Sequence, residues 1–409
     1  MSSKEDGLRI LIITDDRFPP FRVDLTELFD QEFSSRGHQI SWLMQSEESC
    51  SKSYYTTWSN GEAWVGSTNN GYSALDRVSK NIRGFVNDLK LFSILRKKKY
   101  DCIQVKDKFV AALIAILAAK FNSLPFVYWL SYPFPEADLY AFKQGTKRYS
   151  YIYWIRGNLF KFLLYRVILQ KAEHIFVQSE QMKKDVSQYG IPLKKLTAVP
   201  MGVSMELLQH YNMNNISKKN YKEKWVVYIG ILIRERRLDF LVRTFKRVVQ
   251  KVENTKLYFV GDGVVPDDLK LLKDEVMRCG LGNLVVFTGF LPREQALSYV
   301  KDADVCVSPF YPTPILNSTS PTKLIEYLAL GKAAVVNDHP EQRHVIEESG
   351  GGICVPYDED AFANAIITLL TDQCKAEEMG KKGHAYVLRE RIYGKIAEIV
   401  EKQYQLICR

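Results

Sequence analysis

Several common signals are missing from this 409-residue chain. Its seven cysteines lie singly, with no C-x-x-C pair, so neither a disulfide framework nor a zinc site is expected. The longest uncharged apolar run, Phe109–Ala119, is about half the length of a membrane span, and it predicts a buried helix instead. The first residues, MSSKEDG, are polar and lead into an apolar run, so we predict no targeting signal and a cytoplasmic protein with reduced thiols.

The short motifs of several enzyme classes are also missing. There is no G-x-S-x-G, P-loop or H-E-x-x-H. Neither Thr14–Asp24 nor Gly230–Arg237 supplies the G-x-G-x-x-G of dinucleotide-binding proteins. Asp302-Ala-Asp304 has the form of a metal-binding D-x-D, but Asp304 opens a predicted strand. We therefore predict no metal site and no cofactor.

The composition that is present is that of a globular protein. Hydrophobic residues make up 46% and charged residues 25% of the chain. A chain of this length is expected to divide into two domains of about 200 residues each. The net charge of +9 allows anionic partners without identifying one, and nothing in the sequence indicates a nucleic-acid site.

Apolar strand-like runs alternate with amphipathic stretches through most of the chain, which predicts an α/β fold of two doubly wound parallel sheets facing a cleft. Tyr54–Trp58 and Glu62–Val65 flank Asn60-Gly61, a strong hairpin signal. The predicted parts are an N-terminal acceptor-side domain at 1–209, a polar linker at 210–224, a C-terminal nucleotide-sugar domain at 225–388, and a last helix at 389–409 that packs back on the first domain.

One stretch, Asn317–Asn337, carries a candidate anion site. Ser320 is predicted to cap a helix whose first residue is Pro321. Lys323 and Glu326 then share one face near the positive end of this helix. Exposed N–H groups and a lysine at a helix start favour an anion, although an ordinary αβ unit with a solvated Lys–Glu pair explains the stretch equally well by itself.

Strand ends of the second half add further candidates. The strand Trp225–Tyr228 leads into Gly230, followed by Arg234 and Arg236. An arginine after the first strand of a domain suits a diphosphate, because its planar group donates two hydrogen bonds to one oxyanion. Gly261 and Gly263 follow the next strand, where glycine lets the backbone approach a ligand closely.

These residues resemble the nucleotide-binding domain of retaining GT-B-fold glycosyltransferases of the family 4 group. The matching stretches include VVYIGILIRERRLDFLV, LYFVGDG, VVFTGFLPREQALSYVKDADVCVSP and SPTKLIEYLALGKAAVVN, and the resemblance covers about Glu173 to the C-terminus. It implies transfer of a sugar, of the hexosyl type, from a UDP- or GDP-sugar to a glycan or lipid-linked acceptor, as in polysaccharide biosynthesis. It implies retention at the anomeric carbon and no metal.

Position by position, the resemblance places Glu326 on the ribose hydroxyls, Arg236 on the diphosphate, and the backbone of Phe290 and Leu291 beside the base. Together with the motifs, it predicts catalytic roles for Arg234, Arg236 and Lys323. The predicted donor-binding residues are Gly230, Gly261, Gly263, Phe290, Leu291, Ser318, Ser320, Thr322 and Glu326.

The chain departs from the family pattern at several positions. Ser318 stands where the family has its first glutamate, and Ile231 replaces an arginine. Phe21-Arg22 replace a Gly-Gly loop, and Leu130-Ser131-Tyr132 replace a histidine region. Arg22, Ser131 and Tyr132 are therefore the predicted acceptor-side residues. A sugar-nucleotide epimerase with this fold and a non-catalytic nucleotide-binding relative remain as alternatives.

The segment 143–171 predicts contact with an anionic membrane surface. No acid occurs between Asp138 and Glu173, whereas seven basic residues do, interleaved with Trp and Tyr. Tyr151–Gln170 can be written as one amphipathic helix. Cations and aromatic rings suit the headgroup layer, so we expect peripheral binding at the inner face of the membrane, although a helix packed within the first domain with solvated lysines is the alternative.

Overall fold

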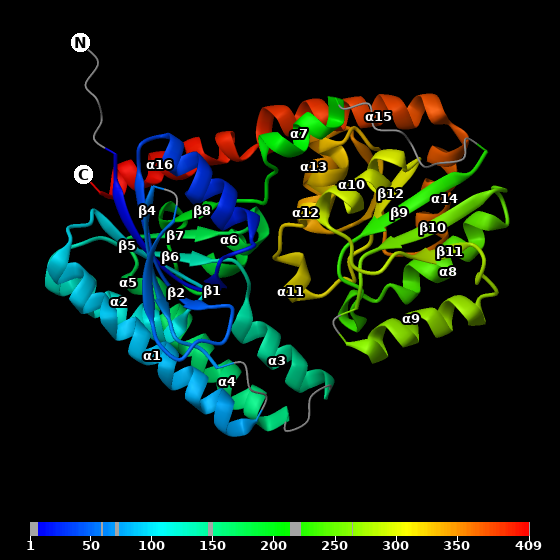
Figure 1. Ribbon diagram of the computed structural model, residues 1–409. Coiled ribbons are helices and arrows are strands. Elements are labelled where there is room, and N and C mark those ends of the chain that lie inside the picture. Colours follow the sequence, from blue (N-terminus) through cyan, green and yellow to red (C-terminus); the bar gives the residue numbers. More distant parts are fainter. Residues whose placement is uncertain are drawn as a thin grey trace, which may run out of the picture. The chain divides into compact units, whose positions relative to one another are not determined.

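The computed structural model describes residues 7–58, 60–69, 73–145, 150–212, 222–263 and 265–408. The chain forms two compact α/β units, each with a Rossmann-like sheet and its own core (Figure 1). The first unit is Met1–Pro200 with Tyr393–Arg409, and the second is Met201–Ile392. The second unit thus begins ahead of the predicted linker 210–224, of which 213–221 lies outside the described residues.

The first unit contains an eight-stranded sheet in the order β3-β4-β2-β1-β5-β6-β7-β8. All neighbouring pairs are parallel except β3 and β4, which form the predicted hairpin. The strands are β1 (Arg9–Phe18), β2 (Gln39–Ser46), β3 (Tyr54–Trp58), β4 (Gly61–Gly66), β5 (Cys102–Lys106), β6 (Phe126–Leu130), β7 (His174–Val177) and β8 (Leu196–Ala198).

Helices cover both faces of this sheet. They are the π-helix η1 (Asp24–Phe33), α1 (Ala74–Lys97), α2 (Phe109–Asn122), α3 (Phe134–Gln144), α4 (Ser150–Phe162), the π-helix η2 (Leu163–Ile168), α5 (Leu169–Lys171), α6 (Glu180–Ser187), the 3-10 turn η3 (Leu193–Lys195) and α16 (Tyr393–Ile407). Helix α1 begins at Ala74 because Ser73 and Asp76 form a reciprocal capping box at its start. The single helix predicted at Tyr151–Gln170 is interrupted by the π-helical turns of η2.

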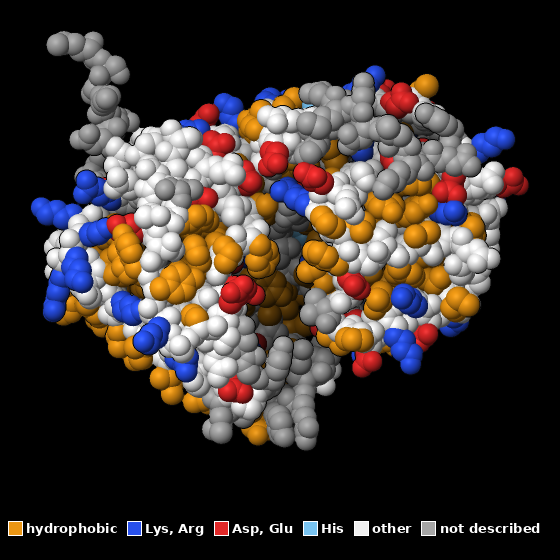
Figure 2. Space-filling model, viewed as in Figure 1, with side chains coloured by type: hydrophobic (Ala, Val, Ile, Leu, Met, Phe, Trp, Pro, Cys, Tyr) orange, Lys and Arg blue, Asp and Glu red, His pale blue; other side chains and the backbone are white. Residues whose placement is uncertain are grey.

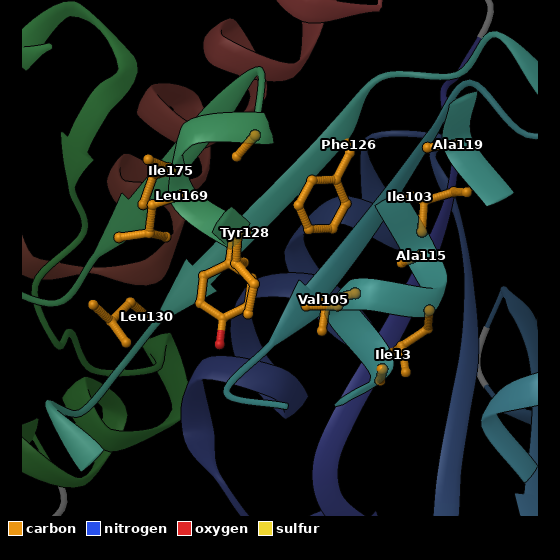
Figure 3. Close-up of a cluster of buried hydrophobic side chains, with 14 of the residues drawn as sticks. Ile13, Ile103, Val105, Ala115, Ala119, Phe126, Tyr128, Leu130, Leu169 and Ile175 are labelled. Atoms are coloured by element: carbon orange, nitrogen blue, oxygen red, sulfur yellow. The ribbon is translucent and has the colours of Figure 1, made fainter. Parts of the chain in front are cut away.

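The core on one face of the first sheet is formed by β strands and by α1, α2 and η2. Tyr128 and Leu130 of β6, Val105 of β5 and Ile13 of β1 point toward the same side, against Ala115 of α2 (Figure 3). Nearly continuous apolar strands are expected where helices cover a parallel sheet on both faces. On the other face η1 and α16 pack together, and Tyr404 of α16 donates a hydrogen bond to Gln104 of β5.

The second unit contains a six-stranded parallel sheet in the order β11-β10-β9-β12-β13-β14. Its strands are β9 (Lys224–Ile229), β10 (Thr255–Val260), β11 (Val285–Phe287), β12 (Val305–Ser308), β13 (Ala334–Asn337) and β14 (Gly352–Val355). Its helices are α7 (Met205–Asn212), the 3-10 turn η4 (Arg234–Arg236), α8 (Asp239–Val249), α9 (Pro266–Arg278), α10 (Arg293–Asp302), α11 (Pro314–Asn317), α12 (Thr322–Ala329), α13 (Pro340–Ser349), α14 (Glu359–Thr371), α15 (Gln373–Tyr386) and the π-helix η5 (Val387–Arg391).

The strand orders locate where each unit is able to bind a ligand. In an open parallel sheet, ligands bind beyond the carboxyl ends of the strands, where the order reverses. In the first sheet this point lies between β1 and β5, and in the second it lies between β9 and β12. Among the described residues, no helix is both long enough and apolar enough to cross a bilayer.

Candidate functional site

Two cations meet at the switch point of the second sheet. Arg236 follows β9 in η4, and Lys323 lies in the first turn of α12. The guanidinium of Arg236 lies 4.9 Å from the centre of the Phe310 ring, and the ammonium of Lys323 lies 4.9 Å from the same centre. Lys323 also donates a 3.1 Å hydrogen bond to the hydroxyl of Tyr228. The structure therefore brings together two of the three predicted catalytic cations.

The positive charge of this cation pair is only partly balanced by neighbouring groups. Nη1 of Arg236 is buried and has no hydrogen-bond partner among the described residues. Burial, with the nearby charge of Arg236, holds the pKa of Lys323 well below its usual range, and Glu326 offsets this only in part. A buried positive group without a partner is costly, and an anion would remove that cost. The arrangement is suited to binding a diphosphate.

A ring and an amide hold the cations in place. Phe310 follows β12, and its backbone is bound twice by Asn337 at the end of β13: Oδ1 accepts from the N–H of Phe310 at 2.5 Å, and Nδ2 donates to its carbonyl at 2.9 Å. Because both amide atoms are used, the Phe310 ring has a defined position beneath the cations. Sequence reasoning missed both residues, although each lies at the carboxyl end of a strand near the switch point.

Glycines bring the backbone of this region close together. Gly230 follows β9 with a φ of +138°, and a Cβ atom there would lie 3.6 Å from Nζ of Lys323. Gly261 has a φ of +144°, and a Cβ atom there would lie 2.1 Å from the carbonyl oxygen of Gly230. Only glycine fits at Gly261, and the two strand ends consequently approach each other next to the cations.

Glu326 lies on the same helix as Lys323 and is paired with an arginine that the sequence did not single out. Nη2 of Arg293, at the start of α10, lies 3.5 Å from Oε1 of Glu326. Burial raises the pKa of the Glu326 carboxyl, while Arg293 and Lys323 lower it. Arg293 thus favours the carboxylate form that would accept hydrogen bonds from ribose hydroxyls.

A buried histidine lies beside the ring that the two cations share, and the sequence did not single it out. His339 caps α13, and its Nε2 lies 2.7 Å from the carbonyl oxygen of Leu316 while Nδ1 accepts from the N–H of Gln342. Its ring lies 5.1 Å from that of Phe310. Burial lowers the pKa of His339 to about 4, so the imidazole is neutral at pH 7 and supports the site without adding charge.

Two serines serve other purposes than the sequence suggested. The Oγ atom of Ser320 accepts a 3.0 Å hydrogen bond from the N–H of Met201, and the N-cap of α12 is Pro321. The predicted Ser320 cap with Pro321 at the first helical position is therefore wrong, because a distant backbone group takes the hydroxyl. Ser318 is buried, and its hydroxyl donates to the carbonyl of Pro314 at 3.3 Å.

The remaining predicted site residues lie in the surrounding loops and at the start of α12. Arg234 is exposed, and its backbone N–H donates to Asp268, so no described contact joins its side chain to the cation pair. Phe290 is 82% exposed, whereas Leu291 is partly buried against the core. Thr322 is the first residue of α12, and Gly263 follows β10.

The first unit holds a separate polar cluster at its own switch point. Lys106, at the end of β5, is 1% exposed, and its Nζ lies 2.7 Å from Asp16 and 3.6 Å from Asp24. Arg22 donates two 2.9 Å hydrogen bonds to the carboxylate of Asp24. These opposite charges hold the pKa of Asp24 at about 2 despite its burial.

The other two acceptor-side candidates belong to the same region. Ser131 follows β6, and both its N–H and its hydroxyl donate to Asp107. Tyr132 stacks edge-on against Phe134, with ring centres 5.0 Å apart. The predicted residues Arg22 and Ser131 are thus part of a buried ionic cluster, and the signal that would have revealed Lys106 is its place at the end of a strand beside the switch point.

Comparison with known proteins agrees with this geometry. The family model described as glycosyl transferases group 1 matches residues 212–386, and that of glycosyltransferase family 4 matches residues 30–207. Alpha-monoglucosyldiacylglycerol synthase of Streptococcus pneumoniae is 22% identical over 331 residues, which is 75% of this chain and 69% of that protein. An uncharacterized glycosyltransferase of Methanocaldococcus jannaschii is 28% identical over 211 residues, 49% of this chain and 48% of that protein.

Solved structures show the same fold. Sucrose-phosphate synthase from Thermosynechococcus elongatus superposes with a TM-score of 0.73 at 17% identity, covering 98% of both chains. HepE of Anabaena, solved in complex with UDP and glucose, superposes with a TM-score of 0.68 at 15% identity, covering 98% of this chain and 100% of that chain. Both are matched over nearly their whole length, so the likeness extends to both units.

Proposed function

Because this chain belongs to the family 4 group of GT-B-fold glycosyltransferases, we propose that it transfers a hexosyl group from a UDP- or GDP-sugar to an acceptor hydroxyl, with retention at the anomeric carbon. One observation carries the proposal: the cations of Arg236 and Lys323 share the Phe310 ring, and a buried nitrogen of Arg236 has no partner. A nucleoside diphosphate supplies the charge and the acceptor oxygens that these groups require.

The same pair explains how the reaction would be promoted. Breaking the bond between the sugar and the diphosphate leaves negative charge on the departing oxygens. Arg236 and Lys323 are already in position, so little reorganisation is needed as this charge develops. Glu326, whose carboxylate form is favoured by Arg293, would accept hydrogen bonds from the ribose, and the loop at Phe290 and Leu291 would meet the base.

The donor and the acceptor are proposed from chemistry and from relatives. HepE was solved with UDP and glucose, which supports a UDP-sugar as the first donor to test. The name of the S. pneumoniae relative specifies a glucosylated diacylglycerol, which supports a lipid-linked acceptor. The basic segment 143–171 is consistent with such an acceptor at the cytoplasmic face of the membrane, although its Lys147 and Arg148 lie outside the described residues.

Incubation of the full chain with radiolabelled UDP- and GDP-sugars tests the proposal. We expect transfer to a lipid or glycan acceptor, or slow hydrolysis without one, and loss of both in Arg236→Ala. Exposed Arg278→Ala on α9 is a matched control and should keep full activity. Donor binding in thermal-shift assays without transfer or hydrolysis would contradict the proposal.

That contrary outcome would favour a non-catalytic nucleotide-binding protein. The observation behind this second candidate is Ser318, which stands where the family has its first glutamate and whose hydroxyl donates to Pro314. Replacing a carboxylate by a buried hydroxyl removes one group that would hold the donor sugar. Ser318→Glu should then raise transfer if the site is catalytic, and should change nothing if it only binds nucleotide.

A further inference from the structure

Three helices of the first unit lie in one layer over the same face of the sheet. Leu91 and Ile94 of α1, Ala115 of α2, and Leu164 of η2, which continues α4, all belong to the buried cluster that includes Tyr128 of β6. Because the inner sides of α1, α2 and η2 pack on one sheet face, their opposite sides point outward together. Helix α4 continues η2 and packs against α3, and its Phe160 stacks on Phe109 of α2.

The outward side of α1 is apolar along much of its length. Five large hydrophobic side chains between 42% and 58% exposed recur at helical spacing, and they are Val78, Ile82, Phe85, Val86 and Leu89. A helix that covers a sheet normally directs charged and polar residues outward. This one presents an apolar stripe on the side that the core does not use.

The neighbouring helices extend the stripe. On α2, Leu117 is 54% and Phe121 is 79% exposed. On α4, Trp154, Ile155 and Leu159 are each at least 50% exposed. Figure 2 shows hydrophobic side chains gathered along the margin of the first unit where Figure 1 places α1, with Lys and Arg side chains beside them. An exposed apolar surface of this extent marks an interaction site.

The charges on these helices are almost entirely positive. Helices α2 and α4 contain no acidic residue, and α1 contains only Asp76, in its first turn, and Asp88. Asp88 is 2% exposed and accepts a hydrogen bond from Lys108, so it adds no free negative charge to the surface. Among the described side chains of the three helices, the exposed basic residues are Arg96, Lys97, Lys120 and Arg156, of which Arg156 is paired with Asp138 of α3. Lys80, Arg83, Lys90 and Lys161 are half-buried, and the ammonium of Lys161 lies 5.1 Å from the centre of the Tyr189 ring.

We propose that the outward faces of α1, α2 and α4 form a single docking surface for an anionic lipid bilayer. The apolar stripe enters the boundary of headgroups and acyl chains, the exposed basic residues face the anionic headgroups, and Trp154 lies at the interface. A nucleic acid would match the basic residues but leave the apolar stripe in water. This inference depends on the proposed function only in one respect: docking would bring the chain to a lipid-linked acceptor.

This surface differs from the one the sequence suggested. The segment 143–171 contains α4, but α1 and α2 lie outside it. A docking surface confined to that segment would depend on α4 alone. In the three-helix surface, α1 is an equal part, and changes on α1 provide the discriminating test.

Co-sedimentation of the full chain with phosphatidylglycerol-containing and pure phosphatidylcholine vesicles, at low and high salt, tests the proposal. We expect binding to the anionic vesicles that weakens with salt. The double variant Ile82→Glu with Phe85→Glu should lower the partition coefficient about tenfold or more, because charge replaces apolar contact. Ile399→Glu on α16, which is also an exposed position of the first unit, is the matched control and should bind as the unaltered chain does.

Two further measurements keep the result interpretable. The α1 double variant should retain UDP binding and donor hydrolysis, which shows that it is folded. In the unaltered chain, hydrogen exchange in α1, α2 and α4 should slow when anionic vesicles are added. Vesicle binding without sugar transfer would support the docking proposal and contradict the proposed function. Sugar transfer without vesicle binding would support the proposed function and contradict the docking proposal.

Three outcomes would overturn the docking proposal. One is equal and negligible sedimentation of the unaltered chain with both kinds of vesicle. Another is normal binding of the Ile82→Glu, Phe85→Glu variant. The third is a concentration-dependent dimer in analytical ultracentrifugation that this variant abolishes, since a second copy of the chain would then cover the surface.

Discussion

Nη2 of Arg293 lies 3.5 Å from Oε1 of Glu326, and this ion pair joins the start of α10 to α12. Burial by itself would favour the protonated carboxyl, whereas the neighbouring guanidinium favours the carboxylate. The protonation state of Glu326 is therefore expected to depend on Arg293. Arg293 would thus affect the proposed hydrogen bonds from the ribose to Glu326 without contacting the donor itself.

Glu326→Ala should mainly weaken use of the donor. Loss of a charged hydrogen bond to the ribose costs about 1.5–3 kcal/mol, or roughly 10- to 150-fold in kcat/KM. In Arg293→Gln the pKa of Glu326 should rise further, so UDP affinity should begin to fall at a higher pH as the solution is acidified. Calorimetric titrations between pH 5 and 8 would measure this, and an unchanged donor KM in Glu326→Ala would remove the residue from the site.

Lys323 should take up a proton when a diphosphate binds. Its pKa is held well below the usual range in the free protein, and a bound anion favours the charged form and raises it again. At a pH between these two values, UDP binding should absorb up to one proton, whereas uridine should absorb none. Calorimetry in two buffers of different ionisation enthalpy detects the uptake, which Lys323→Met should abolish and exposed Lys382→Met should not.

Asn337→Ala should affect both stability and the reaction. It leaves the buried N–H and carbonyl of Phe310 without their partners, at a cost of about 1–3 kcal/mol for each group. The Phe310 ring then loses its fixed position, so UDP affinity should fall more than uridine affinity. Asn364 on α14 is exposed, and Asn364→Ala is the control in urea unfolding and in the titrations with UDP and with uridine. Equal losses for UDP and uridine would mean that Asn337 only stabilises the fold.

Lys106→Met should destabilise the first unit by about 3 kcal/mol at pH 7, because it removes the buried cation that Asp16 and Asp24 share and leaves Arg22 as their remaining cation. The low pKa of Asp24, about 2, means that its contribution is present above the ordinary carboxyl pKa and is lost as pH falls from about 4 toward 2. In Lys106→Met this loss should begin at a higher pH. Urea unfolding at several pH values, with exposed Lys120→Met as control, would measure both effects.

Chelation should have little effect on sugar transfer. Among the described residues, no group of three or more Asp, Glu, His or Cys side chains is arranged to hold a metal ion. Asp304 instead accepts a 2.6 Å hydrogen bond from the N–H of Trp225. Initial rates before and after dialysis against EDTA provide the measurement. Activity that disappears and then returns with Mn²⁺ would require Asp302 and Asp304 to be reconsidered, and Asp302→Asn would test them directly.

The sequence by itself determined the features that depend on local chemistry. Alternating apolar runs specified the order of strands and helices, because a buried parallel strand and an amphipathic helix have different periods. Gly261 was predicted to let the backbone approach a ligand after a strand end, and the structure places its backbone against that of Gly230. The spacing of three residues was enough to place Lys323 and Glu326 on one side of a helix.

Only the tertiary structure decided which partner each group meets. Ser320 is a good capping residue locally, yet its hydroxyl is taken by Met201, 119 residues away. Phe310 and Asn337 are 27 residues apart and carry no recognisable motif, yet together they position the cations. Helix α1 is apolar on two sides, and its period alone does not say which side is buried. Packing of Leu91 and Ile94 against the sheet settled that choice and left Ile82 and Phe85 on the surface, because long-range contacts are not encoded in helical spacing.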